Sequence, residues 1–349
     1  MDQITPRLTR AAVWTRGGVD IREMEIPELG PGDVLVRVGL ATVCGSDLHT
    51  VSGRRDAPCP SILGHEAVGQ VVAIGSGANP EVVGECVRPL AVGDRVVWSV
   101  TVPCHRCPRC AKGFTAKCVN VRKVGHESAL GPWALSGSYA AHIVLPSGTA
   151  IALVPDSLPD AVAAPAACAT ATVMAVLEAA GDLTDKRVLI YGAGMLGVTA
   201  AAAAAEAGAV VQMVDPNPLR QIQSHQFGAS DADDRLLTDI AIDFSGAPAA
   251  VNAALQRLDL GGRLVLAGSV SPGPAVAVDP EDVVRRWLTI TGVHNYEPRH
   301  LGQAVAFLAA TSGKYPWATL VDEPVTLDDV NDVLRPPSSP ATLRSSIAP

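Results

Sequence analysis

The pattern of hydrophobic and polar positions changes near Pro159, and the two sides of this change predict different kinds of structure. Before it, short apolar runs rich in β-branched residues alternate with clusters of turn residues. These runs predict strands at residues 34–38, 67–74, 94–97 and 139–145. We therefore expect an antiparallel or barrel-like β-rich domain, with long loops between its strands.

After Pro159, segments with helical spacing alternate with short apolar runs. The pattern predicts helices at residues 160–180, 195–207, 219–227 and 249–258, and strands at residues 187–191, 210–214, 240–244 and 263–270. Strands that alternate with helices form βαβ units, so this part predicts a parallel, doubly wound sheet of the Rossmann type. The predicted fold class is thus α/β plus β.

The segment after Gly292 returns to an irregular pattern, with one predicted helix at residues 301–310. We expect it to rejoin the first domain, which makes the β-rich domain discontinuous. The predicted boundaries are residues 1–157 for the β-rich domain, 158–292 for the α/β domain and 293–349 for the return. The proline-rich residues 336–340 are expected to be poorly ordered or to lie at an edge.

Length and composition are those of an ordinary globular protein with two domains. The chain has 349 residues, of which 48% are hydrophobic and 18% are charged. A net charge of −8 and the lack of a long basic run argue against a nucleic-acid partner. The most apolar stretch, residues 198–211, is interrupted by Glu206 and Gly208 and is shorter than the ~20 residues of a membrane span. Because Met1 opens no signal-peptide pattern, we expect a soluble cytoplasmic protein without a membrane partner.

Eight cysteines in such a protein indicate metal binding rather than disulfides, because the cytosol keeps thiols reduced. Four of them fall in a lobe at residues 100–120: Cys104, Cys107, Cys110 and Cys118. Four thiolates close the tetrahedral shell of a zinc ion, so this zinc would be structural. An iron–sulfur cluster is the alternative, although it generally uses another spacing. We expect Cys59 and Cys86 to be buried thiols or loop residues.

A glycine-rich turn follows the predicted strand at residues 187–191 and opens the next helix, which is the context of a dinucleotide-binding site. The candidate cofactor-binding residues of this turn are Gly192, Gly194, Met195, Leu196 and Gly197. They let the backbone approach the pyrophosphate at the N-terminus of a helix. The alternative is that the glycines serve only the turn geometry.

Asp215 ends the next predicted strand, 23 residues after Gly192. A carboxylate at this position accepts hydrogen bonds from the ribose hydroxyl groups of NAD and repels the additional phosphate group of NADP. The sequence therefore favours NAD, although Arg220 on the following helix would weaken the preference. The alternative is that Asp215 only caps the turn of Pro216, Asn217 and Pro218.

Two further segments combine thiolate, imidazole and carboxylate groups: Cys44-Gly45-Ser46-Asp47-Leu48-His49 and Gly64-His65-Glu66. Spacing alone does not connect them to Cys168. However, the order of these segments, the four-cysteine lobe, Cys168 and the glycine turn resembles the zinc-dependent medium-chain alcohol dehydrogenases over nearly the whole chain. The resemblance implies a GroES-like catalytic domain, a Rossmann domain for NAD and two zinc ions per chain. It also implies a homodimer or homotetramer.

By this resemblance, Cys44, His65 and Cys168 hold a catalytic zinc ion, whose fourth position stays open for water or substrate. Glu66 is the nearby carboxylate that exchanges with water or substrate at the metal. Asp47 orients His65 from outside the ligand set. The implied substrate is a small alcohol, or the matching aldehyde or ketone.

The resemblance also implies a path for the proton of the alcohol. Ser46 hydrogen-bonds the substrate hydroxyl group, and its proton passes through the nicotinamide ribose to His49, while hydride moves to NAD. If His49 is only a surface residue, bulk water would relieve Ser46 instead. In one respect the chain departs from the family: residues 227–244 are shorter than usual, so one helix or strand there is expected to be missing.

The substrate pocket is less defined by the sequence. Trp98, Val100 and the loop around Trp133 are expected either to line the pocket or to pack in the core. A positive rim, or simply a solvated surface, is the expectation for Arg54, Arg55, Arg122, Lys123 and His126. The second Gly-His-Glu sequence, at residues 125–127, lacks a matching cysteine set and is interpreted as a loop.

Residues 168–172 and 287–296 resemble a bacterial subgroup described as phosphonate-catabolism-associated alcohol dehydrogenases. A phosphonate or phosphate group on the alcohol would suit the arginines, because a guanidinium group binds such oxyanions in bidentate fashion.

Two other functions remain as alternatives. One is a zinc-independent reductase of the same superfamily that acts on an activated double bond or a quinone. The other is a non-catalytic nucleotide- and metal-binding sensor, for which Ser46 and His49 would be coincidental.

Overall fold

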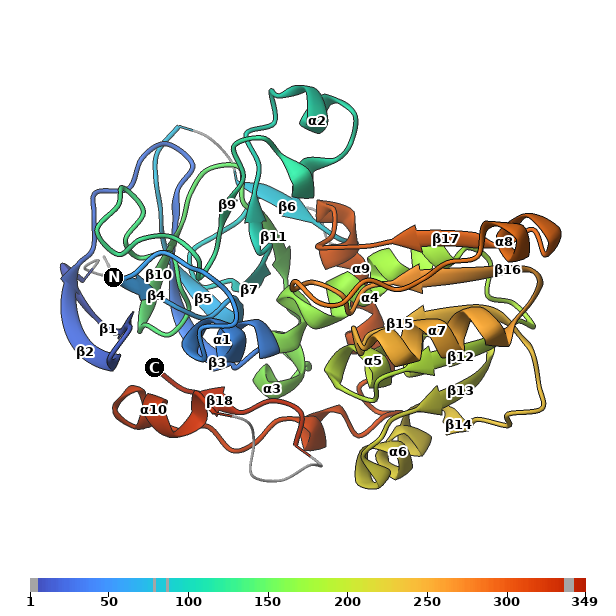
Figure 1. The fold of residues 1–349 in the computed structure, drawn as a ribbon. Coiled ribbons are helices and arrows are strands. Elements are labelled where there is room, and N and C mark those ends of the chain that lie inside the picture. Colours follow the sequence, from blue (N-terminus) through green and yellow to red (C-terminus); the bar gives the residue numbers. More distant parts are fainter. Residues whose placement is uncertain (1–5, 78–79, 86–87, 336–341) are drawn as a thin grey trace.

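Mostly antiparallel strands build the N-terminal part of the molecule, on the left of Figure 1. The computed structural model describes residues 6–77, 80–85, 88–335 and 342–349. The larger sheet runs in the order β10 (His142–Leu145), β3 (Val34–Thr42), β5 (Glu66–Ile74), β7 (Arg95–Trp98), β11 (Ala150–Leu153) and β6 (Glu81–Val83). A smaller sheet contains β2 (Gly18–Glu25), β1 (Leu8–Thr15) and β4 (Ser61–Ile62). Apolar side chains of both sheets share one core, as the predicted β-rich fold requires.

A lobe projects from this part at the top of Figure 1. Two short strands pair at its base, β8 (Thr101–Val102) and β9 (Arg122–Lys123). Between them lie α2 (Pro108–Ala111) and the 3-10 helix η1 (Thr115–Lys117), so the lobe encloses the four clustered cysteines.

A parallel sheet forms the other part of the molecule, on the right of Figure 1. Its order is β14 (Ala229–Asp231), β13 (Val210–Val214), β12 (Arg187–Tyr191), β15 (Thr238–Asp243), β16 (Leu258–Leu266) and β17 (Thr289–Gly292). The helices that connect these strands are α5 (Met195–Glu206), α6 with η3 (Pro218–Ser224, His225–Phe227), α7 (Pro248–Arg257) and α8 (Pro280–Arg285). After Arg187, the central strand β12 is apolar and buried at every position, because both of its faces are covered. This sheet confirms the predicted fold class.

The predicted helix at residues 160–180 is wrong in one respect, because it is three pieces. They are α3 (Asp160–Ala163), the 3-10 helix η2 (Ala164–Ala167) and α4 (Ala169–Ala180). Cys168, between the last two, has φ −130° and ψ −65°, outside the helical region. Pro165 lacks an N–H donor, which favours a tight turn over a continuous α-helix here. The break turns the chain at Cys168.

The shortening that the sequence predicts at residues 227–244 lies in the connection between β14 and β15. β14 ends at Asp231 and β15 begins at Thr238, and the intervening residues 232–237 contain no helix. A connection this short leaves no room for a crossover helix, yet the two strands are not adjacent in the sheet.

The C-terminal segment returns to the β-rich part, below it in Figure 1. α9 (Pro298–Thr311) packs on α4, and η4 (Trp317–Leu320), η5 (Leu327–Asp329) and α10 (Val330–Val333) follow. β18 (Ser346–Ile347) then pairs antiparallel with β3, with Ser346 opposite Thr42. The proline-rich residues 336–340 lie outside the described residues, as does Cys86.

Within the described ranges, no single helix is long and apolar enough to cross a membrane. α3 and η2 are long and apolar enough only when they are counted together with α4, and a bend of 54° separates them from it. Most side chains of α4, including Val173 and Val176, are buried in the protein core.

Candidate active site

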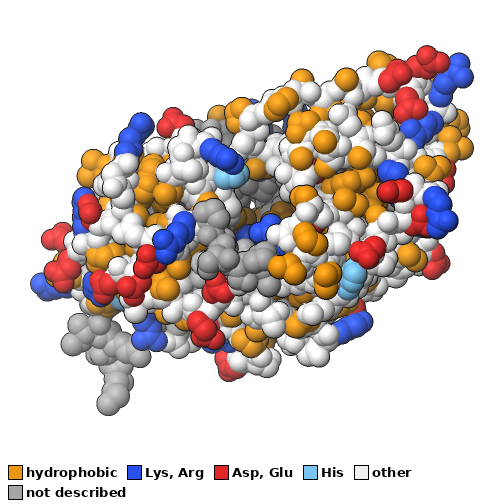
Figure 2. Space-filling view, turned by 60° about the horizontal axis from the view of Figure 1, so that its bottom comes forward, with side chains coloured by type: hydrophobic (Ala, Val, Ile, Leu, Met, Phe, Trp, Pro, Cys, Tyr) orange, Lys and Arg blue, Asp and Glu red, His pale blue; other side chains and the backbone are white. Residues whose placement is uncertain are grey.

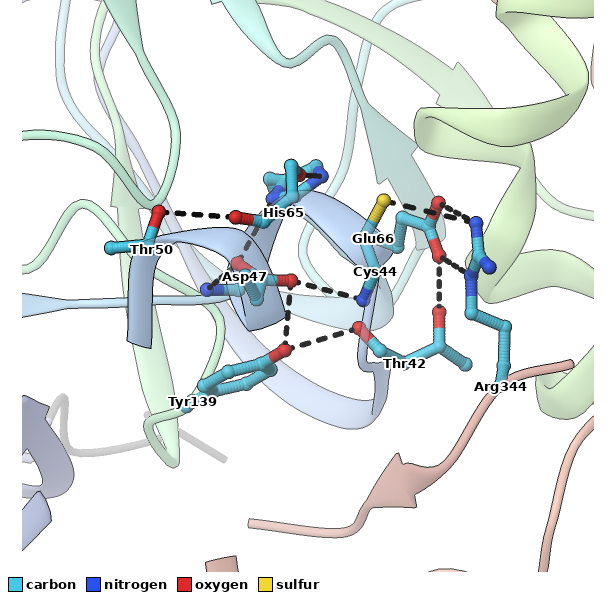
Figure 3. Close-up of polar contacts among 10 residues, drawn as sticks. Thr42, Cys44, Asp47, Thr50, His65, Glu66, Tyr139 and Arg344 are labelled. Atoms are coloured by element: carbon cyan, nitrogen blue, oxygen red, sulfur yellow. Dashed lines mark hydrogen bonds and ion pairs between the residues drawn. The ribbon is translucent and has the colours of Figure 1, made fainter. Parts of the chain in front are cut away.

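Asp47 connects the two loops that carry Cys44 and His65 (Figure 3). Its Oδ2 accepts hydrogen bonds from the Cys44 backbone N–H at 3.0 Å and from the Tyr139 hydroxyl at 3.0 Å. Its Oδ1 accepts one from the Gly64 N–H at 3.4 Å. Asp47 lies in the first turn of α1 (Gly45–Val51), where the helix dipole also favours a carboxylate. The fully buried carboxylate thus fixes both loops relative to each other.

The His65 ring lies between Asp47 and Ser46. Its Nδ1 is 3.4 Å from Asp47 Oδ1, which is long for a hydrogen bond but close for two charged groups. Burial alone would lower the pKa of His65, but the Asp47 carboxylate raises it well above its ordinary value. Nε2 lies 3.2 Å from the Ser46 hydroxyl oxygen. The carboxylate therefore orients the ring so that Nε2 is the nitrogen available to a metal.

Four predicted site residues come together in one cluster. The Sγ atoms of Cys44 and Cys168, a ring nitrogen of His65 and a carboxylate oxygen of Glu66 all lie within 4.8 Å of one another. A hydrogen bond from Cys168, together with Arg344 and His65, lowers the pKa of Cys44 well below its ordinary value despite burial. The same hydrogen bond raises the pKa of Cys168. Two thiols and an imidazole at this separation fit the donor set of zinc.

Arg344 is a member of this site that sequence analysis missed. Its Nε and Nη2 donate to Glu66 Oε2 and Oε1 at 2.8 and 3.1 Å, and Nη2 lies 3.7 Å from Cys44 Sγ. The Thr42 hydroxyl donates to Glu66 Oε2 at 2.8 Å. Burial raises the pKa of Glu66, while Arg344 opposes the rise. Arg344 lies 278 positions after Glu66, so no local sequence pattern signals the pair.

The four cysteines of the lobe form a second cluster, again within 4.8 Å of one another. Cys107 Sγ lies 3.5 Å from Cys110 Sγ and 3.9 Å from Cys118 Sγ. Zinc–sulfur bonds of ~2.3 Å in a tetrahedron separate the sulfurs by about 3.8 Å, so the spacing fits. Backbone N–H groups of Val119 and Cys110 lower the pKa of Cys107 to about 6, which favours the thiolate that binds metal.

The glycine turn has the geometry that its sequence predicts. Gly192 has φ +99°, and a Cβ atom on Gly197 would lie 1.8 Å from the Gly192 carbonyl oxygen. A Cβ atom on Gly194 would meet no atom within 4 Å, because it faces the open cleft at the N-terminus of α5. Gly192 and Gly197 are thus required by the fold, whereas Gly194 leaves space for a ligand.

Asp215 serves the turn next to it. Its Oδ2 accepts the Ala193 N–H at 2.7 Å and its Oδ1 accepts the Asn217 N–H at 2.8 Å. The capping role given above as an alternative is therefore present. Arg220 lines a cavity with Gly194 and Met195.

A cavity of about 400 Å³ joins the metal cluster to the glycine turn. Figure 2 shows a hollow between the two halves of the molecule, with Lys, Arg and His side chains at its edge. The lining residues include Ser46, His49, Cys44, His65, Cys168, Gly194, Met195, Leu196, Gly197, Phe244 and Ser245. A ligand in this cavity would contact the metal cluster and the nucleotide turn at the same time.

The predicted pocket residues divide into two groups. Val100, Arg55, Lys123 and His126 line the cavity. Of the two alternatives for Trp98 and Trp133, core packing is the one that the structure shows: both are buried in the core of the β-rich part, where the Trp133 indole donates to the Val144 carbonyl at 2.7 Å. Of the predicted rim, Arg122 instead lies over the Trp133 ring, 5.3 Å from its centre, and Arg54 is exposed outside the cavity.

Residues 294–297, which sequence analysis did not identify as functional, connect the lobe to the cavity. Lys117 donates to His294 Nδ1 at 2.7 Å, and the Glu297 carboxylate accepts the backbone N–H groups of Thr115 and Ala116 at 3.0 and 3.2 Å. The buried Tyr296 hydroxyl accepts the Val100 N–H at 3.2 Å and donates to the carbonyl just before Cys168. This segment therefore contacts the lobe, the cavity wall and the turn that carries Cys168.

Family models match most of the chain. The model of the alcohol dehydrogenase GroES-like domain matches residues 30–156, and the model of the zinc-binding dehydrogenases matches residues 196–310. Between them they cover both clusters except Cys168, but only Leu196 and Gly197 of the glycine turn.

Individual proteins are similar over nearly the whole length. The chain is 31% identical to the 5-exo-hydroxycamphor dehydrogenase of Pseudomonas putida, over 93% of this chain and 94% of that protein. It is 31% identical to the L-threonine 3-dehydrogenase of Aeromonas salmonicida, over 80% and 82%. An alcohol dehydrogenase structure from Thermotoga maritima has a TM-score of 0.87 at 25% identity, covering 98% and 99% of the two chains. An acetophenone reductase of Geotrichum candidum, in complex with NAD, shares the fold, with a TM-score of 0.81 at 24% identity over 99% and 98%.

Proposed function

The chain belongs to the zinc-dependent medium-chain alcohol dehydrogenase family, and on that basis we propose that it oxidises an alcohol with NAD, or reduces the matching aldehyde or ketone. It is an oxidoreductase of the NAD(P)-dependent alcohol dehydrogenase type and uses zinc. The observation that carries the narrower proposal is the cluster of Cys44, His65 and Cys168 within one cavity with the glycine turn.

We assign Cys44, His65 and Cys168 as the ligands of the catalytic zinc. Bound there, zinc supplies a Lewis acid that makes the substrate hydroxyl group more acidic, and the nicotinamide supplies the hydride acceptor. Asp47 keeps the His65 ring in its metal-binding orientation. Glu66 remains beside the ligands with its charge balanced by Arg344.

Ser46 takes the proton of the hydroxyl group, and His49 delivers it to solvent. The two residues lie three positions apart on α1, which places them on one face of the helix. Both line the cavity, so a substrate next to Ser46 lies within reach of the relay. Ser46 and His49 would therefore lead the proton from the metal cluster toward solvent.

We propose NAD as the preferred cofactor. The glycine turn at Gly192, Gly194 and Gly197 would hold the pyrophosphate, and Asp215 at the end of β13 would face the ribose hydroxyls. A carboxylate at this position repels the additional phosphate group of NADP, which favours NAD. The domain boundaries 157/158 and 292/293 then separate a catalytic part from a nucleotide-binding part.

We infer that the alcohol carries a phosphonate or phosphate group. Of the predicted basic rim, Arg55 and Lys123 line the cavity next to the metal cluster, which supports an anionic substrate.

We further infer a homodimer or homotetramer that acts in the cytosol. β17 is an edge strand of the described sheet, and apolar side chains around it are exposed: Val284, Trp287 and Ile290.

Metal analysis and an activity assay test the function. We expect two zinc ions per chain and formation of NADH with a panel of primary, secondary and phosphonylated alcohols. Cys168→Ser should keep the zinc ion of the lobe, lose the other and lose turnover. One zinc or none in the unmodified protein, with no turnover, would instead support a zinc-independent reductase or a non-catalytic sensor.

A further inference from the structure

The cavity next to the metal cluster has an unbalanced charge. Among the residues that the structure describes, its lining includes Arg55, Lys123, Arg344 and several histidines, but no aspartate or glutamate. This is unexpected in a chain with a net charge of −8. Arg344 is neutralised by Glu66, so the excess charge lies at Arg55 and Lys123.

Neither Arg55 nor Lys123 has a side-chain hydrogen bond or ion pair with another residue in the described part of the chain. The backbone of each is nevertheless held in place. The Arg55 N–H donates to the carbonyl of His49 at 3.1 Å, and the Lys123 N–H donates to Glu127 Oε1 at 2.8 Å. Two anchored cations without a partner indicate a site that is completed by a ligand.

Burial and the positive charge of this region lower the pKa values of neighbouring basic groups. Burial, then Arg55 and Lys117, lower the pKa of Lys123. Burial, then Lys117, Lys123 and Arg55, lower the pKa of His294 to about 4. Four residues from three parts of the chain, Arg55, Lys117 with Lys123, and His294, therefore lie close enough to affect one another, and an oxyanion would stabilise this region.

Two neutral donors complete the region. Lys117 has only donors, so the His294 Nδ1 atom 2.7 Å away must accept, and the ring proton is on Nε2. The Asn295 Nδ2 group is buried and has no hydrogen-bond partner in the described structure. Both residues line the same cavity as Arg55 and Lys123.

We propose that Arg55, Lys123, His294 and Asn295 form a binding subsite for an oxyanionic group at the far end of the alcohol substrate. This inference rests on the proposed function and specifies which residues select its substrate. A side cavity of about 240 Å³ continues past Arg55 and Lys123 and gives the anion room. Of the acidic residues there, Glu127 is engaged by the Lys123 backbone and Asp56 is 98% exposed.

The first test compares substrates that differ only in the distal group: a hydroxyalkylphosphonate, a hydroxyalkyl phosphate, a hydroxycarboxylate and a neutral diol of equal length. Arg55→Gln and Lys123→Met should each raise KM for the preferred oxyanionic alcohol about tenfold or more, with kcat/KM for the diol unchanged. Arg54→Gln is the matched control, because this neighbouring arginine is exposed outside the cavity. The ranking of the three oxyanions identifies the natural group.

The second test measures binding without turnover. Methylphosphonate should bind the zinc-loaded protein saturated with NADH in a calorimeter, and the double variant R55Q/K123M should lose this binding. Equal binding to the double variant, or none to the original protein, overturns the subsite. Because the probe has no hydroxyl group, retained binding without oxidation of any alcohol would instead overturn only the proposed function. A diol oxidised as well as the oxyanionic alcohols would overturn the subsite and the inferred phosphonate or phosphate group, but not the alcohol dehydrogenase activity.

Discussion

Asp47 and Glu66 are both buried carboxylates beside the same metal cluster, but their partners give them different tasks. Asp47 accepts hydrogen bonds from two backbone N–H groups and the Tyr139 hydroxyl, and it faces His65. Glu66 is paired with Arg344. One carboxylate thus orients a ligand, while the other is kept from adding uncompensated negative charge next to two thiols.

The relay at Ser46 gives a prediction at the scale of one atom. Ser46→Ala should lower kcat by about 10²-fold or more, because the proton of the alcohol loses its acceptor. Zinc content and the Kd for NAD should not change, since neither depends on the hydroxyl group. Stopped-flow and steady-state kinetics measure the loss, and the exposed Ser52→Ala is the control. A kcat within twofold of the original would remove Ser46 from the proton path.

Sequence analysis identified the metal site through a family resemblance, because the local spacing of Cys44, Asp47 and His49 does not connect them to Cys168. It missed Arg344 and Tyr139, which approach the site only through tertiary pairing. The pairing of β18 with β3 puts Ser346 opposite Thr42 and so brings Arg344 to Glu66. No periodicity or motif in the sequence predicts which residue of β18 pairs with which residue of β3.

At the scale of elements, the strands of the parallel sheet were the most predictable feature. The predictions at residues 187–191 and 210–214 coincide with β12 and β13, because such strands are short, apolar and bounded by polar turns. The break at Cys168 was not predictable in the same way. Alanine-rich sequence favours a helix throughout residues 160–180, and the turn at Pro165 depends on packing against the β-rich part.

The turn between β12 and α5 separates two roles of glycine. Gly197→Ala should destabilise the protein by about 1–3 kcal/mol, because its Cβ would overlap the Gly192 carbonyl oxygen. Gly194→Ala should leave stability unchanged and weaken NAD binding about tenfold, since only the cofactor approaches that position. Denaturant unfolding and calorimetric NAD titration distinguish the two effects. Equal losses of stability would contradict this assignment.

At the scale of the whole molecule, the exposed edge at β17 bears on assembly. We expect Ile290→Lys to lower the mass of the proposed homodimer or homotetramer, because a charge on an apolar edge opposes strand pairing between subunits. Light scattering coupled to size exclusion measures the mass. Val210→Lys is the matched control, because Val210 is 61% exposed on β13, an interior strand of the same sheet. A monomeric original protein, or an assembly that survives Ile290→Lys, would move the contact elsewhere.

The cavity is built from segments that are far apart in the sequence, so its lining could be known only from the fold and not from the sequence motifs alone. The cavity takes its lining from α1, from β9, from the turn at Cys168, from the glycine turn and from residues after β17. The sequence predicted the β-rich and parallel parts, but not which loops would face each other across the cavity. His294 and Asn295 line the cavity for this reason, although no sequence motif indicated them.

The segment at residues 294–297 sets a constraint on any redesign of this enzyme. His294 and Asn295 face the ligand cavity, whereas the side chains of Tyr296 and Glu297 attach to the turn before Cys168 and to the lobe. A library that randomises all four positions would mostly lose folded protein. One restricted to the first two could retune which alcohols are accepted while preserving the scaffold.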